Sequence, residues 1–246
     1  MIKIFLVAEA FMTVGNFIGN YLNLFIGSFI GKMPTDSTAE LVMNSNIWLI
    51  ILVAVIIGPI VEELIFRKLL MDRLGIYGDR LAIFVSAIAF GIFHCNLYQF
   101  FYATLLGFVL AYMYSKTSNV WYPIGLHMII NFFGSVIPML LMDKIVRFEE
   151  LSALIMNTAP ENISNDVMLE LTQLSAIVGG YSLLQIGMTV AGLIIFFKQR
   201  RKIFVSDRCE VFIPKNRRGN VIFGNAGVIC FLVITGILIT FNLFVS

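Results

Sequence analysis

Long apolar runs interrupted by few charges dominate the chain from end to end. An apolar run of about 17 to 25 residues is long enough to cross a bilayer as a helix. The pattern therefore predicts an all-α polytopic membrane helix bundle with about seven transmembrane helices, and no internal repeat divides residues 1–246, which we treat as a single integral membrane domain. The predicted spans are 4–30, 47–71, 81–96, 98–115, 120–142, 175–197 and 222–244.

Two local patterns predict how these helices pack. The third span is short and its connection to the fourth, around Asn96, is tight, which predicts an antiparallel hairpin. GxxxG spacings at Gly15 and Gly19, and again at Gly27 and Gly31, predict close approach of helix backbones.

Composition agrees with the bilayer as the main surroundings of the chain. Hydrophobic residues make up 59% of the 246 residues and charged residues only 13%, about half the share of a soluble domain. The net charge of +2, without a basic stripe, gives no footprint for nucleic acid. Cys95, Cys209 and Cys230 have neither disulfide-framework nor zinc-finger spacing. We expect a multi-pass protein of the cell membrane with no nucleic-acid partner.

The distribution of Lys and Arg predicts the orientation. If the N-terminus is cytoplasmic, 14 of the 17 basic residues fall inside and only Lys32, Lys144 and Arg147 fall outside. The positive-inside rule favours this arrangement, N-in and C-out. The acid-rich stretch 143–174 then becomes an outer surface or interfacial segment.

The second span contains the most unusual charges of the chain. Glu62, Glu63 and Arg67 lie inside an apolar run, where each charge costs several kcal/mol and therefore suggests a function. Glu63 and Arg67 are four residues apart and can pair on one helix face, while Glu62 points about 100° away and stays available. Gly58 and Pro59, one turn earlier, predict a kink that opens room for water beside Glu62. A purely structural clamp is the alternative interpretation of the Glu63–Arg67 pair.

Three further polar residues lie in later spans at comparable depth. His94 lies in the third span, and His127 and Asn131 share a face of the fifth. At 1.5 Å per residue, Glu62, His94 and His127 lie roughly ~15, ~20 and ~12 Å from the inner ends of their helices. Each histidine alone is compatible with simple packing, but the shared depth predicts one intramembrane site.

This set of side chains suits hydrolysis of a peptide bond. A carboxylate and an imidazole can activate one water, and an imidazole and an amide can stabilise the oxyanion that forms. A cysteine nucleophile is disfavoured, because Cys95 adjoins His94 and neighbouring helical side chains point about 100° apart.

Three motifs carry a resemblance to a known family. The motifs are EExxxR in GPIVEELIFRKLL, FxxxH in FGIFH and HxxxN in GLHMIIN. In this order they resemble the motifs of the CPBP intramembrane proteases. That family includes type II CAAX prenyl proteases and bacteriocin-processing or immunity proteins. The resemblance covers about residues 47–135 and implies a catalytic core over 47–142, spans two to five. It implies that Glu62 and His94 activate water and that His127 and Asn131 form the oxyanion site. Glu63 and Arg67 are then supporting residues.

A metal ion is the open question of this site. Glu62, His94 and His127 are a donor set of the kind that holds catalytic zinc, and members of the family have been called metalloproteases. The chain has no HExxH pair, and a glutamate-dependent mechanism explains Asn131 better. We therefore expect no cofactor, with zinc on these three residues as the alternative.

The sequence thus predicts an intramembrane endopeptidase that cleaves a membrane-associated peptide or protein. Prenylated proteins and leader peptides are both candidate substrates. One alternative is a non-catalytic protein of the same fold that acts in bacteriocin self-immunity by binding. Another is a transporter with a Glu and His proton relay, which the lack of duplicated halves disfavours.

Overall fold

A computed structural model describes residues 1–32, 36–159, 163–203, 205, 209–212, 214, 216–217, 219 and 224–244. Every regular element in these described ranges is a helix, so the predicted all-α membrane bundle is confirmed. The longer helices are α1 (Ile2–Ile30), α6 (Asp79–Phe93), α7 (Leu97–Thr117), α8 (Trp121–Asn131), α9 (Ile137–Met156), α10 (Asn165–Gln199) and α12 (Ala226–Phe244). The shorter ones are α2 (Ser37–Met43), α3 (Ile47–Ile50), α4 (Gly58–Glu63), α5 (Asp72–Leu74), the π-helical η1 (Ile51–Ile57), η2 (Leu64–Met71) and η4 (Phe132–Val136), and the 3-10 turns η3 (Gly75–Tyr77) and η6 (Arg200–Lys202).

Six helical stretches among the described residues have the length and apolar composition to cross a membrane. They are Ile2–Ile30, Ile47–Tyr77, Leu97–Thr117, Trp121–Met156, Asn165–Gln199 and Ala226–Leu243. The predicted third span is also present as α6, but its 15 residues are fewer than the ~20 that a crossing needs. Multi-pass insertion in the membrane is therefore confirmed, while the N-in orientation remains a prediction.

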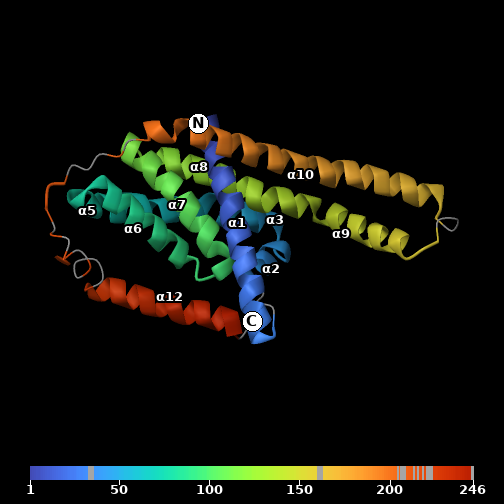
Figure 1. Ribbon diagram of the computed structural model, residues 1–246, viewed down its shortest axis with the longest axis horizontal. Helices are drawn as coiled ribbons and strands as arrows, with labels where there is room; N and C mark the ends of the chain where they lie inside the picture. The colour runs from blue at the N-terminus through green and yellow to red at the C-terminus, as the bar shows by residue number, and fades with distance from the viewer. Residues whose placement is uncertain are drawn as a thin grey trace.

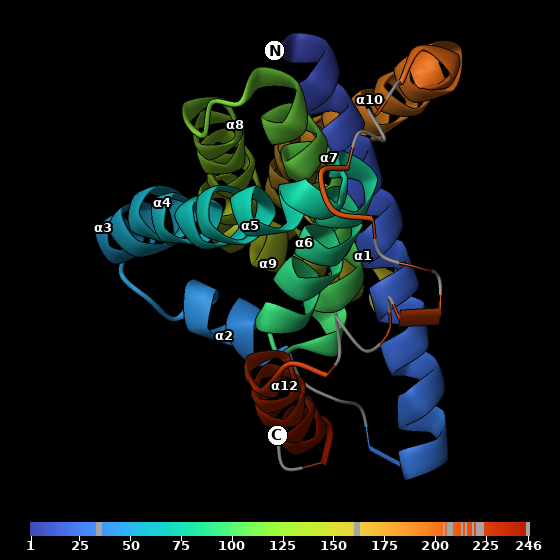
Figure 2. The same ribbon diagram turned by 90° about the vertical axis from the view of Figure 1, so that its left-hand side faces the viewer.

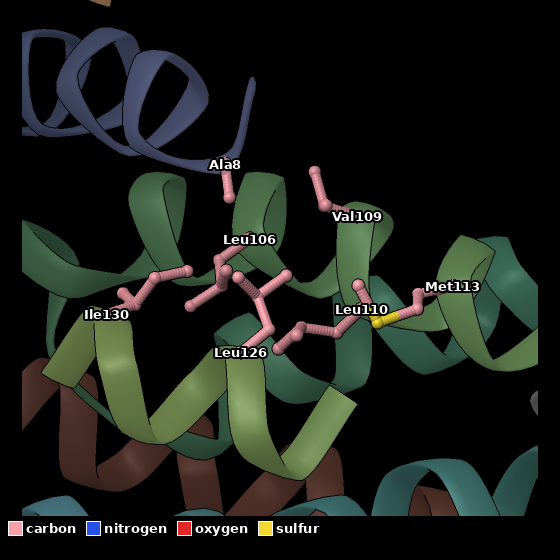
Figure 3. Packing of buried hydrophobic residues seen from close by; sticks show 7 residues of the cluster. All are labelled: Ala8, Leu106, Val109, Leu110, Met113, Leu126 and Ile130. Atoms are coloured by element: carbon pink, nitrogen blue, oxygen red, sulfur yellow. The ribbon is translucent and has the colours of Figure 1, made fainter. Parts of the chain in front are cut away.

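The core of the bundle forms where α1, α7 and α8 meet (Figures 1 and 2). Leu106 and Leu110 of α7 lie between Ala8 of α1 and Leu126 and Ile130 of α8, as Figure 3 shows. These five side chains are at most 2% exposed. Burial of each aliphatic side chain contributes roughly 1.5 to 3 kcal/mol of transfer free energy, so this contact fixes α8 and the residues on its opposite face.

Glycines allow the close contact of α1 with α7, as the first GxxxG spacing predicts. A Cβ at Gly15 would lie 2.5 Å from Tyr102 Cα, and a Cβ at Gly19 would lie 2.7 Å from the Tyr98 carbonyl oxygen. Gly31 behaves differently, because it ends α1 in the left-handed conformation with φ 74° and has open space around it. The packing prediction from the second spacing is therefore wrong at Gly31.

The hairpin of α6 and α7 is confirmed, and α12 lies near its closed end (Figure 2). Cys95 and Asn96 form the connection, with Cys95 at φ 51°. The Asn96 side chain caps α7 by accepting a hydrogen bond from the Tyr98 backbone N–H at 2.9 Å. A residue with positive φ followed directly by an N-cap reverses the chain within two residues. The two helices are therefore antiparallel.

The predicted helix ends around 143–174 are wrong. α9 continues to Met156 and α10 begins at Asn165, so the acid-rich stretch is largely helical. The two helices run side by side and extend beyond the rest of the bundle (Figure 1). An ion pair of Arg147 Nε with Glu170 Oε1 at 2.8 Å joins them. Charged side chains on such a pair face water, while Leu151 of α9 and Leu174 of α10 are buried. Composition alone did not distinguish this helix pair from a loop.

Candidate active site

The irregular winding of the second span frees a backbone carbonyl beside the site. At the junction of η1 and α4, the Gly58 N–H bonds to the Val53 carbonyl, five residues back. Pro59 has no N–H. The Ala54 carbonyl therefore lacks donors from the positions four and five residues on, and the Asn131 Nδ2 of α8 donates to it at 2.8 Å. This irregularity at Gly58 and Pro59 provides the carbonyl that anchors Asn131, while the predicted kink and the room for water beside Glu62 remain predictions.

The predicted Glu63–Arg67 pair is confirmed and lies in the centre of the bundle. Arg67 Nε is 2.8 Å from Glu63 Oε2, and Arg67 Nη2 donates to Glu63 Oε1 at 3.2 Å. Arg67 Nη1 donates to Ser86 Oγ of α6 at 2.9 Å, and Ser86 donates to the Phe66 carbonyl at 3.0 Å. The guanidinium carbon lies 5.0 Å from the centre of the Phe90 ring. Because Glu63, Arg67 and Ser86 are fully buried, each charge depends on these partners.

His127 joins the carboxylates of both glutamates. Its Nδ1 lies 3.1 Å from Glu63 Oε1, and its Nε2 lies 3.7 Å from Glu62 Oε2. An ionised carboxylate only accepts hydrogen bonds, so His127 donates from Nδ1 and directs Nε2 toward Glu62. Glu63 thus orients His127 as well as pairing with Arg67, a role that sequence reasoning missed.

Glu62 and His94 form the more open part of the site. The Glu62 side chain is 21% exposed, and His94 is partly buried. His94 Nδ1 lies 2.9 Å from the Phe90 carbonyl and must donate to it, which leaves the Nε2 lone pair available. The Phe90 ring contacts both imidazoles edge-on, with centroid distances of 4.9 Å to His94 and 5.6 Å to His127. Phe90 therefore spaces the two histidines apart.

The candidate metal ligands do not fit a three-ligand metal site in this arrangement. Across the described part of the chain, no group of three His, Cys, Asp or Glu side chains is arranged closely enough to hold a metal ion. That includes Glu62, His94 and His127, and both nitrogens of His127 already face carboxylates. The expectation that no metal is bound remains a prediction.

The structure brings the six predicted residues into one region, although their catalytic roles remain predictions. Contacts join Glu62, Glu63, Arg67 and His127 directly, while His94 is linked through Phe90 and Asn131 through α8. Sequence reasoning missed Ser86. Its signal was available, since Ser86 interrupts the apolar part of α6, lies four residues before Phe90 and so shares the face that meets Arg67.

Comparison with known proteins shows which class of protein this site resembles. Residues 44–133 match the family described as type II CAAX prenyl endopeptidase Rce1-like. The predicted resemblance to the CPBP proteases is thereby confirmed.

A similar curated protein is "Putative membrane peptidase YdiL" of Bacillus subtilis (strain 168), which is 35% identical over 106 residues. The match covers 42% of this chain and 43% of the relative, so less than half of either length is shared. No solved structure matches the chain.

Proposed function

We propose that this chain is an intramembrane endopeptidase that uses Glu62 to activate water. The observation that carries the proposal is one partly exposed carboxylate, Glu62, beside the Nε2 of an imidazole that a fully buried Glu63–Arg67 pair holds in place. A carboxylate in this position can take a proton from water, and the buried pair keeps the second carboxylate from competing. The match of residues 44–133 to a prenyl endopeptidase family supports the same chemistry.

The proposed reaction begins with water near Glu62 and the Nε2 of His94. As the water oxygen attacks the carbonyl carbon of the scissile peptide bond, its proton passes to Glu62. Glu62 later gives this proton to the departing amine nitrogen, so that the C–N bond breaks and a carboxylic acid and an amine are released. The acid keeps the second proton of the water and then loses it to solvent. Binding by two fixed groups holds the water in one attack geometry.

In this proposal, His127 and Asn131 stabilise the oxyanion. An amide NH2 has two protons, and Asn131 uses one of them on the Ala54 carbonyl, which fixes the direction of the other. His127, once it carries protons on both nitrogens, presents an Nε2–H on the side where Glu62 lies. One such preorganised donor contributes about 3 kcal/mol to transition-state stabilisation.

We propose that the reaction needs no metal. The donors of Glu62, His94 and His127 each have a role in the mechanism above, and their arrangement does not fit a three-ligand site. The proposed substrates are membrane-associated peptides or proteins, with prenylated C-terminal segments suggested by the family description. The bilayer would present such a substrate at the depth of the site.

Cleavage of a peptide library tests the proposal. The purified protein in nanodiscs is incubated with a pool of lipidated and unlipidated peptides, including prenylated ones, and products are identified by mass spectrometry. Cleavage is expected from the wild type and lost in Glu62→Gln and in His94→Ala. Glu9→Gln is the matched control, because Glu9 is also a buried carboxylate within a span but lies on α1, and its variant should retain activity.

The outcomes separate the candidate functions. Cleavage that persists in Glu62→Gln would overturn the proposed mechanism. A folded wild-type protein that cleaves no peptide in the pool and no membrane protein in a proteomic comparison with Glu62→Gln would favour the alternative of a non-catalytic binding protein. Glu62-dependent proton flux without cleavage would favour a transporter.

A further inference from the structure

We propose that Asn242 and Asp36 are positioning residues for His94, acting through the turn that follows it. The inference rests on the proposed function, because the group positioned is His94. Both residues lie outside the segment 44–133, so the family match does not cover them. They meet the same two-residue turn from opposite ends of the sequence.

His94 lies at the weakest point of its helix. It is the C-cap of α6, where its N–H bonds to the Gly91 carbonyl at 3.4 Å and the next N–H bonds to the Ile92 carbonyl at 3.0 Å. Terminal turns of this kind fray easily, since carbonyls beyond the last helical bond have no intrahelical donor. A catalytic imidazole at such a place needs a fixed backbone from elsewhere.

Cys95, the residue after His94, has a conformation that its side chain disfavours. Its φ is 51°, in the left-handed region that glycine adopts readily and a residue with a Cβ does not. Such conformations persist where the surroundings enforce them. Contacts made by Cys95 and Asn96 therefore have to stabilise this conformation.

Two hydrogen bonds from distant segments hold this turn. Asn242 Nδ2 of α12 donates to the Cys95 carbonyl at 2.8 Å. Asn96 Nδ2 donates to Asp36 Oδ1 at 2.8 Å, while the Asn96 Oδ1 accepts from the Tyr98 N–H. The first contact bridges 147 residues of sequence and the second bridges 60. The two bonds thus fix the Cys95 carbonyl and the Asn96 side chain, one on each residue of the turn.

General packing of α12 does not account for the contact of Asn242. Among the described side chains of α12, Thr235 alone is buried, and most of the apolar side chains of this helix are exposed. Asn242, near the C-terminal end of this helix, instead reaches the Cys95 carbonyl in the connection between α6 and α7. A directed polar contact from a weakly packed helix indicates a specific role at the turn it touches.

The first test combines removal of the contact with relief of the strained turn. In nanodiscs, Asn242→Ala should lower kcat for the peptide cleaved by the wild type by between about 10-fold and 100-fold, with KM unchanged, because His94 is displaced while the substrate still binds. Thr240→Ala is the matched control, since Thr240 lies on the same helix end and donates to the Gly236 carbonyl within that helix. The double variant Asn242→Ala, Cys95→Gly should recover most of the lost kcat, because glycine adopts φ 51° without the steric cost that Cys95 carries.

The second test repairs the other contact by exchange. Asn96→Asp retains the acceptor that caps α7 but places a carboxylate against Asp36, and kcat should fall. Adding Asp36→Asn restores one donor and one acceptor across the contact and should restore kcat. Recovery in this pair cannot be explained by a merely destabilised protein.

A third measurement does not require a substrate. In a Cys209→Ser, Cys230→Ser background, the maleimide labelling rate of Cys95 in native membranes should rise about two- to tenfold in Asn242→Ala, as expected when one hydrogen bond is lost. A wild type without peptidase activity would refute the proposed function, yet this rate would still show whether Asn242 holds the turn. An unchanged labelling rate, or a kcat loss that Cys95→Gly leaves unrepaired, would overturn the positioning role.

Discussion

Replacing Arg67 by Met should destabilise the protein more than any other single removal of a charge in the second span. Met has similar length and packs well in apolar surroundings, so the change removes the guanidinium with little loss of volume. Glu63 then retains a buried carboxylate whose remaining side-chain contact is His127 Nδ1 at 3.1 Å. The perturbation therefore isolates the electrostatic contribution of the pair.

The expected size follows from the contacts of the buried guanidinium. Removal of one partner of a buried ion pair costs about 3 to 5 kcal/mol, because the other charge stays buried without compensation. Loss of the donor to Ser86 adds about 1 kcal/mol. The contact with Phe90 adds about 0.5 to 2 kcal/mol. Since such contributions overlap, a total near 4 to 6 kcal/mol is the expected decrease in the free energy of unfolding.

Titration with SDS in mixed micelles, followed by intrinsic fluorescence, measures this free energy for a helical membrane protein. Lys68→Met is the matched control, because its Nζ pairs with Asp72 Oδ2 at 2.7 Å on an exposed surface, and little change is expected. The double variant Glu63→Gln, Arg67→Met removes both charges and should recover about 2 kcal/mol or more relative to Arg67→Met.

Two results would refute this reasoning. A loss below about 1 kcal/mol for Arg67→Met would mean that water reaches Glu63 and compensates its charge. A double variant no more stable than Arg67→Met would mean that the cost comes from packing and not from the unpaired carboxylate.

Three further predictions concern packing, the oxyanion site and the metal. Gly192→Ala should destabilise the protein by about 1 to 3 kcal/mol, measured by thermal unfolding in detergent, because the added Cβ overlaps the Leu6 carbonyl oxygen of α1. Pro59→Ala restores an N–H close to the Ala54 carbonyl, competes with Asn131 for it, and should lower kcat about tenfold at constant KM. Prolonged treatment with EDTA should leave kcat/KM for the cleaved peptide unchanged, because the proposed mechanism uses no metal.

Each of these predictions has a control or a contrary outcome. Gly187→Ala on the same helix as Gly192 has open space for its Cβ and should keep the wild-type melting temperature. Pro138→Ala, near the start of α9, should keep the wild-type kcat. Activity lost in EDTA and restored by zinc would contradict the metal-free mechanism.

The sequence predicts this fold well because its signals are local. Apolar runs define spans without knowledge of their neighbours, and the Glu63–Arg67 pair follows from a four-residue spacing within one helix. The glycines of α1 likewise predict close contact with another helix, although not which helix it is. Two predictions misled: the second GxxxG spacing, since Gly31 ends α1 in open space, and the acid-rich stretch 143–174, since surface helices and loops share a polar composition.

The hydrogen-bond partners within the site could not be predicted from local patterns. The contact of His127 with Glu63 joins residues 64 apart in sequence, and no local pattern specifies it. The anchor of Asn131 is a backbone carbonyl, Ala54, that becomes available only because η1 winds more widely than an α-helix. Backbone groups have no identity in a sequence, so such partners emerge only when the helices are assembled.

The paired helices α9 and α10 have a practical consequence for imaging the protein. The helical stretches Trp121–Met156 and Asn165–Gln199 have 36 and 35 residues, or about 54 and 52 Å at 1.5 Å per residue. A hydrocarbon core of about 30 Å leaves roughly 20 Å of each outside it, joined by the Arg147–Glu170 ion pair. A soluble domain fused through both helices, in place of residues 157–164, would have two rigid attachments. The chain has a mass of only 27.7 kDa, and the rigidly fused domain would add the mass that particle alignment in electron cryomicroscopy requires.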